Sequence, residues 1–240
     1  MNNIVKQNLN NLYNSSYNFI NSFDLQDLLK NKKSFDMDLG FITNLFDDEE
    51  LKNLRKALKN PSFILAIENA KSVNMNDFEI VEKLVLDIKS SISLLTEEVI
   101  RKNTQIKNQI IFLDYDYGYQ ACFCGFGEGN YPILSKPEYV SYNYNNELYN
   151  GVGNIDLSGI FDNLTKLNEL IEELEIYDLV TDSDLYHQLN KAYQHKACIL
   201  LNDAFSHLGQ QIFNHANITR PLYVYLNEHD CEAMNVFILD

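Results

Sequence analysis

Apolar residues recur at helical spacing through the first hundred positions of the chain. The clearest case is residues 77–103, where one apolar stripe follows Asp77, the expected N-cap. The stripe consists of Phe78, Val81, Leu84, Val85, Ile88, Ile92 and Leu95. Residues 3–31 show similar spacing with an expected break near residues 14–16, and Pro61 suits the first turn of a further helix. The pattern predicts an N-terminal bundle of helices.

The pattern changes to that of strands near residue 108. Residues 110–115 are rich in β-branched and aromatic side chains, residues 116–118 resemble a turn, and residues 119–126 form a returning strand. This arrangement is typical of a β-hairpin. A stretch rich in Gly, Pro, Asn and Tyr follows, in which one short strand is expected at residues 139–144.

Helical spacing returns over residues 156–176 and again over about 183–208. Two further strands, at residues 222–226 and 235–239, flank a polar turn and predict a second hairpin. Helices followed by hairpins and paired helices indicate an α+β fold. We therefore predict an N-terminal helical bundle followed by a mainly antiparallel sheet of two hairpins packed with two helices.

Charge divides the chain at the same place as the pattern. Residues 1–108 carry 14 Lys/Arg and 15 Asp/Glu, whereas residues 109–240 carry 5 and 19, so the second half holds nearly all of the net charge of −15. We expect a helical region over residues 1–107 and an acidic α+β domain over residues 108–240. A strongly anionic body repels nucleic acid and anionic membranes and speeds encounter with cationic partners. A basic protein partner is therefore expected, with no nucleic acid and no membrane.

The location of the protein is inferred from its ends and its cysteines. The first residues hold no apolar signal segment, and no apolar run approaches the roughly 20 residues of a membrane span. Four cysteines in a chain of this kind are expected to stay reduced; they are Cys122, Cys124, Cys198 and Cys231. We predict a cytoplasmic protein, and the sequence leaves its self-association open.

Motifs that would indicate a cofactor or a metal are weak. The glycines between Gly125 and Gly129 lack dinucleotide-binding spacing, and Tyr131-Pro132 follows where a helix would be needed. Cys122 and Cys124 lie on one face of a strand, but zinc sites more often pair two C-x-x-C motifs. We predict no catalytic residues, no cofactor and no metal.

Two other classes of function remain open. Asp203 and His207 are four residues apart on a predicted helix and could meet on its surface. A hydrolase or transferase would need these two side chains to converge with Cys122. A structural protein that self-associates through its N-terminal helices is the other alternative.

Two stretches favour recognition of a basic partner. The carboxylates of one helix lack lysines four residues further on, so pairing within the helix does not explain them; a solvated face that aids solubility would also explain them. The second stretch, residues 131–149, combines tyrosines with Asn and Glu, which suits an interface, although the tyrosines could simply cover the sheet. The predicted partner-binding residues are Tyr142, Tyr144, Glu147, Glu172, Glu173, Glu175 and Asp178.

Residues 110–240 resemble bacterial immunity proteins that neutralise polymorphic or contact-dependent toxins. The similar features are the hairpin over residues 111–126, the loop with Tyr131-Pro132 and Pro137-Glu138-Tyr139, the acidic paired helices, and the closing strands at residues 221–226 and 236–239. The resemblance implies a cytoplasmic antidote without catalytic residues, whose acidic face occupies the basic site of a toxin. The N-terminal helices lie outside it.

Overall fold

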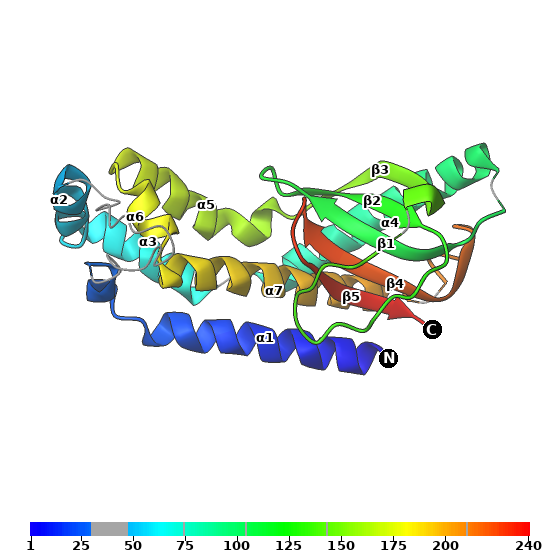
Figure 1. Cartoon of the computed structure of the whole chain (residues 1–240), viewed down its shortest axis with the longest axis horizontal. Helices are drawn as coiled ribbons and strands as arrows, with labels where there is room; N and C mark the ends of the chain where they lie inside the picture. Colours follow the sequence, from blue (N-terminus) through cyan, green and yellow to red (C-terminus); the bar gives the residue numbers. More distant parts are fainter. Residues whose placement is uncertain (30–47, 74, 104, 143, 210) are drawn as a thin grey trace, which may run out of the picture. The chain divides into compact units, whose positions relative to one another are not determined.

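The computed structural model describes residues 1–29, 48–73, 75–103, 105–142, 144–209 and 211–240. They form a mixed α+β fold, as the sequence predicts (Figure 1). Its helices are α1 (Asn2–Ser22), α2 (Asp48–Ala57), α3 (Pro61–Ser72), α4 (Asp77–Lys102), α5 (Ser158–Glu173), α6 (Tyr177–Thr181) and α7 (Asp184–Leu208), with 3₁₀ turns η1 (Leu25–Leu29) and η2 (Tyr144–Asn146). Its strands are β1 (Asn108–Tyr115), β2 (Gln120–Phe126), β3 (Glu147–Asp156), β4 (Ile218–Glu228) and β5 (Ala233–Leu239).

The described strands form one five-stranded sheet in the order β3-β2-β1-β4-β5. Strands β1 and β4 pair in parallel at its centre, and the other neighbours pair antiparallel. The sheet is therefore mixed, with three of the four pairings among the described strands antiparallel, and the prediction of a sheet built of two hairpins is not confirmed. A parallel pair needs a long crossover, and here β2, β3 and α5 to α7 lie between its strands in the chain. Local turn signals do not show which distant strand comes next to which.

The chain divides into two compact units; three of the boundaries fall within α1, α5 and α7, and the fourth lies between α3 and α4. Unit 1 comprises Met1–Leu12, Met75–Ile160 and His195–Asp240, and unit 2 comprises Tyr13–Asn74 and Phe161–Gln194. Unit 1 carries 9 Lys/Arg and 17 Asp/Glu, a net charge of −8, and unit 2 carries 10 and 17, a net charge of −7. The two units thus share the excess of acid almost equally, although the two halves of the sequence do not. The division into domains at residues 107/108 stays a prediction.

In unit 1, helix α4 packs against the sheet and is not part of an N-terminal bundle (Figure 1). The Ser91 hydroxyl donates to the carbonyl of Asn154 in β3 and accepts from the amide of that residue. Gly153 allows this close approach, because a Cβ there would lie 2.4 Å from the Cβ of Ser91. The helical bundle predicted from the apolar stripe is therefore wrong for α4, whose stripe is buried by a sheet. An apolar stripe does not specify what will cover it.

The same face of the sheet is covered by the C-terminal part of α7. Phe205 stacks on Phe237 of β5 with ring centroids 5.5 Å apart, and the Asn202 amide donates to the carbonyl of Val236 at 2.7 Å. Figure 1 shows α4 and α7 behind the sheet and the loop between β2 and β3 in front of it.

Two further local predictions are wrong. Helix α1 is continuous across residues 14–16, where a break was expected. The described residues 139–142 and 144 do not form a strand; instead Glu138 makes an isolated antiparallel bridge with Ala233, and the strand lies later, at β3. At the outer edge of β5, the Asn2 side chain donates to the carbonyl of Ile238 and accepts from its amide. Helix α1 thus satisfies part of an open sheet edge.

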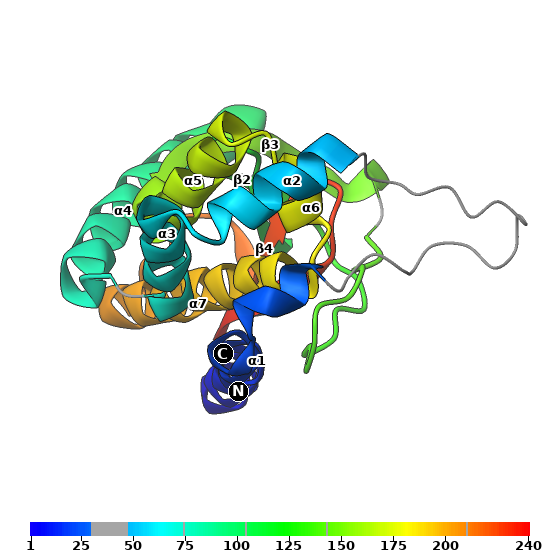
Figure 2. The same cartoon turned by 90° about the vertical axis from the view of Figure 1, so that its left-hand side faces the viewer.

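In unit 2, helices α3, α5 and the first part of α7 pack together (Figure 2). The buried Tyr193 hydroxyl of α7 donates to the carbonyl of Ala70 in α3 at 3.0 Å, and its ring stacks on Phe161 of α5. Asn60 caps α3 by accepting from the amide of Ser62. Pro61 therefore takes the first helical position, as predicted.

Candidate functional site

The face of the sheet opposite α4 and α7 carries aromatic side chains and thiols. Side chains alternate between the faces of a strand, so Phe112 and Asp114 of β1 share this face with Cys122 and Cys124 of β2. The register places Phe112 opposite Cys124 and Asp114 opposite Cys122. On the other side of β1, Asn227 of β4 pairs with Asp114. One row of the sheet therefore combines a thiol, a carboxylate and an amide.

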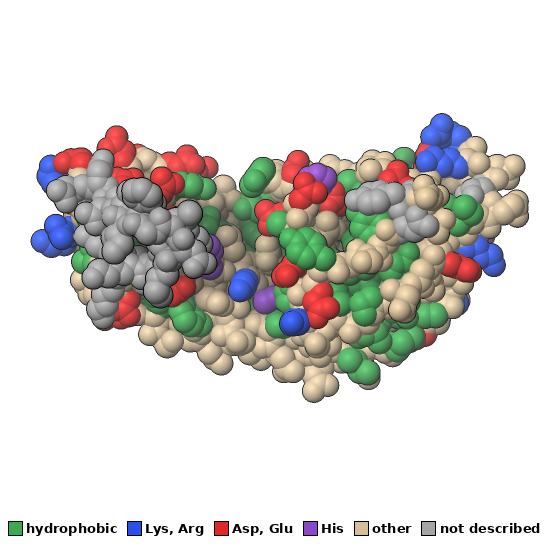
Figure 3. Space-filling view, in the orientation of Figure 1, with side chains coloured by type: hydrophobic (Ala, Val, Ile, Leu, Met, Phe, Trp, Pro, Cys, Tyr) green, Lys and Arg blue, Asp and Glu red, His purple; other side chains and the backbone are tan. Residues whose placement is uncertain are grey.

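Aromatic rings form the apolar part of this face. The ring of Tyr142, from the loop before β3, lies 4.3 Å from that of Phe126 and 5.3 Å from that of Phe112. Phe112 also stacks on Tyr225 of β4 at 5.6 Å, and the Tyr225 hydroxyl donates to the carbonyl of Pro132. The loop thus closes over part of the sheet. The space-filling view shows hydrophobic side chains gathered there with carboxylates beside them (Figure 3).

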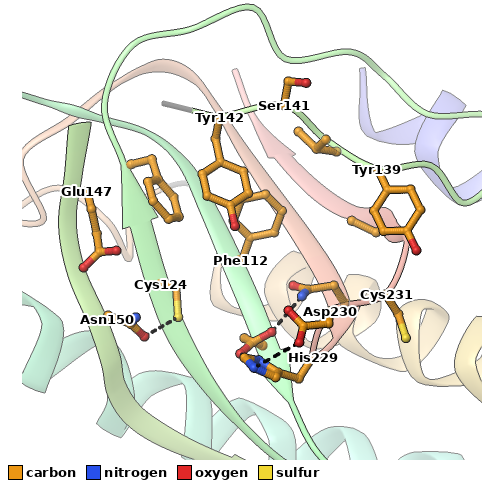
Figure 4. A pocket seen from close by; sticks show the side chains of 15 residues that line it. Phe112, Cys124, Tyr139, Ser141, Tyr142, Glu147, Asn150, His229, Asp230 and Cys231 are labelled. Carbon is orange, nitrogen blue, oxygen red and sulfur yellow. Dashed lines mark hydrogen bonds and ion pairs between the residues drawn. The ribbon is translucent and has the colours of Figure 1, made fainter. Parts of the chain in front are cut away.

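A cleft of about 550 Å³ opens between this loop, the strands and the β4–β5 turn (Figure 4). Its lining is mixed, with aromatic rings, carboxylates, amides and thiols but no lysine or arginine among the described residues. Glu147 and Asn150 lie on one side of Phe112 and Tyr142, and Asp230 lies on the other. The lining residues are Phe112, Asp114, Cys124, Phe126, Tyr139, Val140, Ser141, Tyr142, Glu147, Asn150, Asn227, His229, Asp230, Cys231 and Ala233.

Asp114 is the centre of a hydrogen-bond network at the floor of the cleft. One carboxylate oxygen accepts from the Asn227 amide at 2.7 Å, and the other lies 3.0 Å from Nδ1 of His229. The hydrogen bond and charge of Asp114, with the charges of Asp230 and Asp116, raise the pKa of His229 above its ordinary value. Both oxygens of Asp114 therefore already have partners within the cleft.

Two other polar groups of the lining residues have no partner among the described residues. The Asn227 side-chain oxygen is buried and has no hydrogen-bond partner within the described part of the chain. Glu147 is the exposed first residue of β3, and its side chain likewise forms no ion pair or hydrogen bond among the described residues. An unpaired buried acceptor is costly, so a ligand that donates to Asn227 would regain that free energy.

The two thiols of β2 differ in the direction of their pKa shift. A hydrogen bond from Cys124 lowers the pKa of Cys122 to about 7. The same hydrogen bond and burial raise the pKa of Cys124, which remains a thiol and lies 3.1 Å from the side-chain oxygen of Asn150. Cys122 contacts the carbonyl of Asp114, whereas the His229 ring hydrogen-bonds the carboxylate of that residue.

The structure places only part of the predicted partner-binding set at this cleft. Tyr142 and Glu147 line it. Tyr144 lies in η2, and its side chain is outside the described part of the structure. The other four residues belong to unit 2, where Glu172 and Glu173 end α5. The assignment of the whole set to partner binding stays a prediction.

The unit 2 carboxylates are exposed and gather in part around a second, shallower hollow. Glu175 and Asp178 line it together with Glu49 and Glu50 near the start of α2. Its volume is about 270 Å³, half that of the cleft, and Tyr177 is its one aromatic residue in the described lining. The acidic helix therefore provides charge but little apolar surface for a ligand.

The residues of the enzymatic alternative do not share one network. Cys122 lies on the aromatic face of the sheet with Cys124 and Asp114. Asp203 lies on α7, behind the sheet, and forms an ion pair with Lys6 of α1. His207 is exposed near the end of α7. The described contacts thus give no support to catalysis by this combination of residues.

Sequence reasoning missed most of the polar side of the cleft. Asp114 interrupts an apolar strand, which is the one signal that could have marked it. Asn227 and His229 belong to the predicted turn of the last hairpin, more than 100 residues away in the chain. Only the parallel pairing of β1 with β4 brings them together.

No protein-family model, curated protein or solved structure matches this chain. Within the described ranges, no helix combines the length and apolar character that crossing a membrane requires. The case for function therefore depends on the geometry and charge of the cleft.

Proposed function

We propose that this chain is a non-catalytic binding protein that recognises a basic protein partner through the cleft of unit 1. The supporting observation is the lining of the cleft, where three carboxylates stand beside aromatic rings with no lysine or arginine among the described residues. Carboxylates attract cations, and the faces of aromatic rings do so as well. A cationic side chain would therefore find both charge and apolar contact in one place.

The geometry favours the cleft over the acidic helix as the main contact. Interface energy is concentrated in anchors that bury aromatic surface and exclude water, and the cleft provides such surface at Phe112, Phe126 and Tyr142. Exposed carboxylates such as Glu172 act mainly on the rate of encounter. We assign anchoring to unit 1 and, at most, electrostatic steering to unit 2.

Binding of a defined cationic probe tests this proposal. The probe is a peptide in which Arg-Gly and Lys-Ser dipeptides alternate. A counterpart that contains Glu is the control. Each peptide is titrated into the protein by calorimetry at 50 and 300 mM salt. We expect the cationic peptide alone to bind, more weakly at the higher salt. Glu147→Gln should weaken binding at least fivefold, whereas the exposed control Glu172→Gln should change it less than twofold.

Two results would count against the proposal. Absence of binding by the cationic peptide at 50 mM salt would remove it. Loss of binding in Glu172→Gln with full binding in Glu147→Gln would move the contact to unit 2.

Neutralisation of a toxin in the cytoplasm is a more specific form of the proposal, supported by the resemblance of residues 110–240 to immunity proteins. Its test is genetic. The gene next to this one is expressed alone and together with this chain. Growth arrest that this chain relieves would support the antidote role, and relief should fail in Glu147→Gln. A harmless neighbouring product would refute it.

A further inference from the structure

We infer that the cleft selects the guanidinium group of an arginine side chain over the ammonium group of lysine. This inference rests on the proposed function, because it names the ligand chemistry that the same cleft would recognise. It depends on the shape of the cleft floor and on the positions of the hydrogen-bond acceptors around it.

The floor of the cleft suits a side chain with an apolar stem and a flat, cationic end. Phe112, Phe126 and Tyr142 form one continuous aromatic cluster beside the cavity. Phe112 and Phe126 are only 6% and 5% exposed, so the ring that a ligand can reach is that of the half-buried Tyr142. A guanidinium is planar and weakly hydrated, so it can stack on that ring at a lower desolvation cost than a compact ammonium ion. The methylenes of arginine can cover the remaining apolar surface.

The hydrogen-bond acceptors of the cleft lie on several sides of it. A lysine ammonium carries its three N–H donors on one nitrogen and cannot easily reach all of them. Glu147 lies on one side of the aromatic cluster, and Asp230, whose carboxylate is 3.7 Å from Nε2 of His229, lies on the other. The Asn227 oxygen adds a buried acceptor that lacks a donor within the described residues. A guanidinium has five N–H groups in a rigid fork and can meet a carboxylate through two of them. We assign Glu147 as the carboxylate that pairs with the guanidinium and Asn227 as a further acceptor.

Asp114 has a different role from these two residues. Its oxygens accept from Asn227 and His229, so it fixes the Asn227 amide with its nitrogen turned toward β1. The amide oxygen is thereby kept as the available acceptor. Asp114 is a positioning residue in this scheme, and the ligand need not contact it.

The test uses the full chain, ¹⁵N-labelled, and four probes followed by NMR titration. Three are acetylated and amidated Gly-X-Gly tripeptides in which X is arginine, lysine or citrulline, the last being the neutral isostere of arginine. The fourth is putrescine, a free diamine that carries two ammonium groups. We expect the arginine tripeptide to bind at least tenfold more tightly than the citrulline tripeptide and at least threefold more tightly than the lysine tripeptide.

Variants separate the cleft from general attraction to an acidic protein. Glu147→Gln should reduce arginine binding at least fivefold and abolish most of the preference over citrulline. Because Glu147 is exposed and without partners in the described structure, this change does not threaten folding. Glu172→Gln, which removes the same charge from unit 2, should leave both quantities unchanged.

The outcomes distinguish this inference from the proposed function. Equal, Glu147-dependent binding of the arginine and lysine tripeptides would overturn the guanidinium inference and leave recognition of a basic partner standing. Tighter binding of putrescine than of arginine would overturn it in favour of a free diamine. Failure of the longer cationic peptide described above would remove both proposals.

Discussion

Substitution of Gly125 by alanine should destabilise unit 1, because the fold leaves no room for a methyl group there. Gly125 pairs across the strands with Tyr149 of β3, whose side chain is only 1% exposed. A Cβ at position 125 would lie 2.1 Å from Cζ and 2.3 Å from the hydroxyl oxygen of Tyr149. Carbon atoms in contact stand roughly 3.5–4.0 Å apart, so the buried ring would have to move.

The size of the effect follows from two opposing contributions. Forcing an extra methyl into a packed core typically costs about 1–3 kcal/mol, and the ring of Tyr149 has no solvent-facing space to enter. Replacing glycine also reduces the entropy of the unfolded chain, which returns about 0.4–1 kcal/mol where alanine fits. The net effect of Gly125→Ala should be a loss of about 1–2 kcal/mol in the free energy of unfolding.

A double-mutant cycle isolates the clash. Tyr149→Leu removes the ring atoms nearest to position 125, so adding Gly125→Ala in that background should cost close to nothing. The coupling between the two changes should then be about 1–2 kcal/mol, within the range of directly contacting residues. Gly159→Ala is the matched control, since a Cβ there meets nothing within 4 Å; it should raise stability slightly.

The assay is urea unfolding followed by far-UV circular dichroism, with hydrogen exchange of the β2 amides to locate the loss in the sheet. Exchange is informative because the two units need not unfold together. Equal losses from Gly125→Ala in the presence and absence of the Tyr149 ring would refute the packing argument, as would a comparable loss in Gly159→Ala.

Two further expectations concern single hydrogen bonds. Asp114→Asn should lower the pKa of His229 toward its ordinary value, as measured by NMR titration of the ring protons, while smaller contributions from Asp116 and Asp230 persist. Since the folded pKa of His229 is raised, its ion pair stabilises the fold below the ordinary pKa, and this contribution is lost as pH rises through the raised value; an unchanged titration would contradict the assigned cause. Tyr193→Phe should lower the free energy of unfolding by about 1 kcal/mol in a urea titration, because the buried hydroxyl donates to a carbonyl of α3. An unchanged free energy of unfolding would show that this hydrogen bond makes no net contribution to stability.

Elements with a strong local pattern were predictable. Helix α4 occupies Asp77–Lys102, within one residue of the predicted span, although Asn76 and not Asp77 is its cap. Helix α7 occupies Asp184–Leu208, within one residue of the predicted span, and the Ser183 hydroxyl before it accepts from the amide of Tyr186. In both cases the information lies in neighbouring residues, which is why the sequence alone suffices.

Elements governed by distant packing were not predictable. Asn14, Ser15 and Ser16 are poor helix formers, yet α1 continues through them, and Ser16 is buried. Tertiary contacts outweighed a local preference of this size. The sequence predicts no strand at β3, which contains Gly151 and Gly153, both with positive φ. These glycines belong to an irregular strand whose pairing register shifts along its length, so their presence signalled a bulge and not the absence of a strand.

The distribution of charge shows why the sequence pointed toward a basic partner but not toward the cleft. The halves of the chain differ by 13 charges, whereas the folded units differ by one, at −8 and −7. Charges act on a ligand mainly within a Debye length, about 8 Å at physiological ionic strength. Recognition therefore depends on which carboxylates surround one cavity and what lies between them. The three in the cleft, Asp114, Glu147 and Asp230, come from β1, β3 and the β4–β5 turn. The order of the strands places these three carboxylates around one cavity with an aromatic floor. Neutralising Glu147 should therefore weaken binding more than neutralising any one carboxylate of the acidic helix.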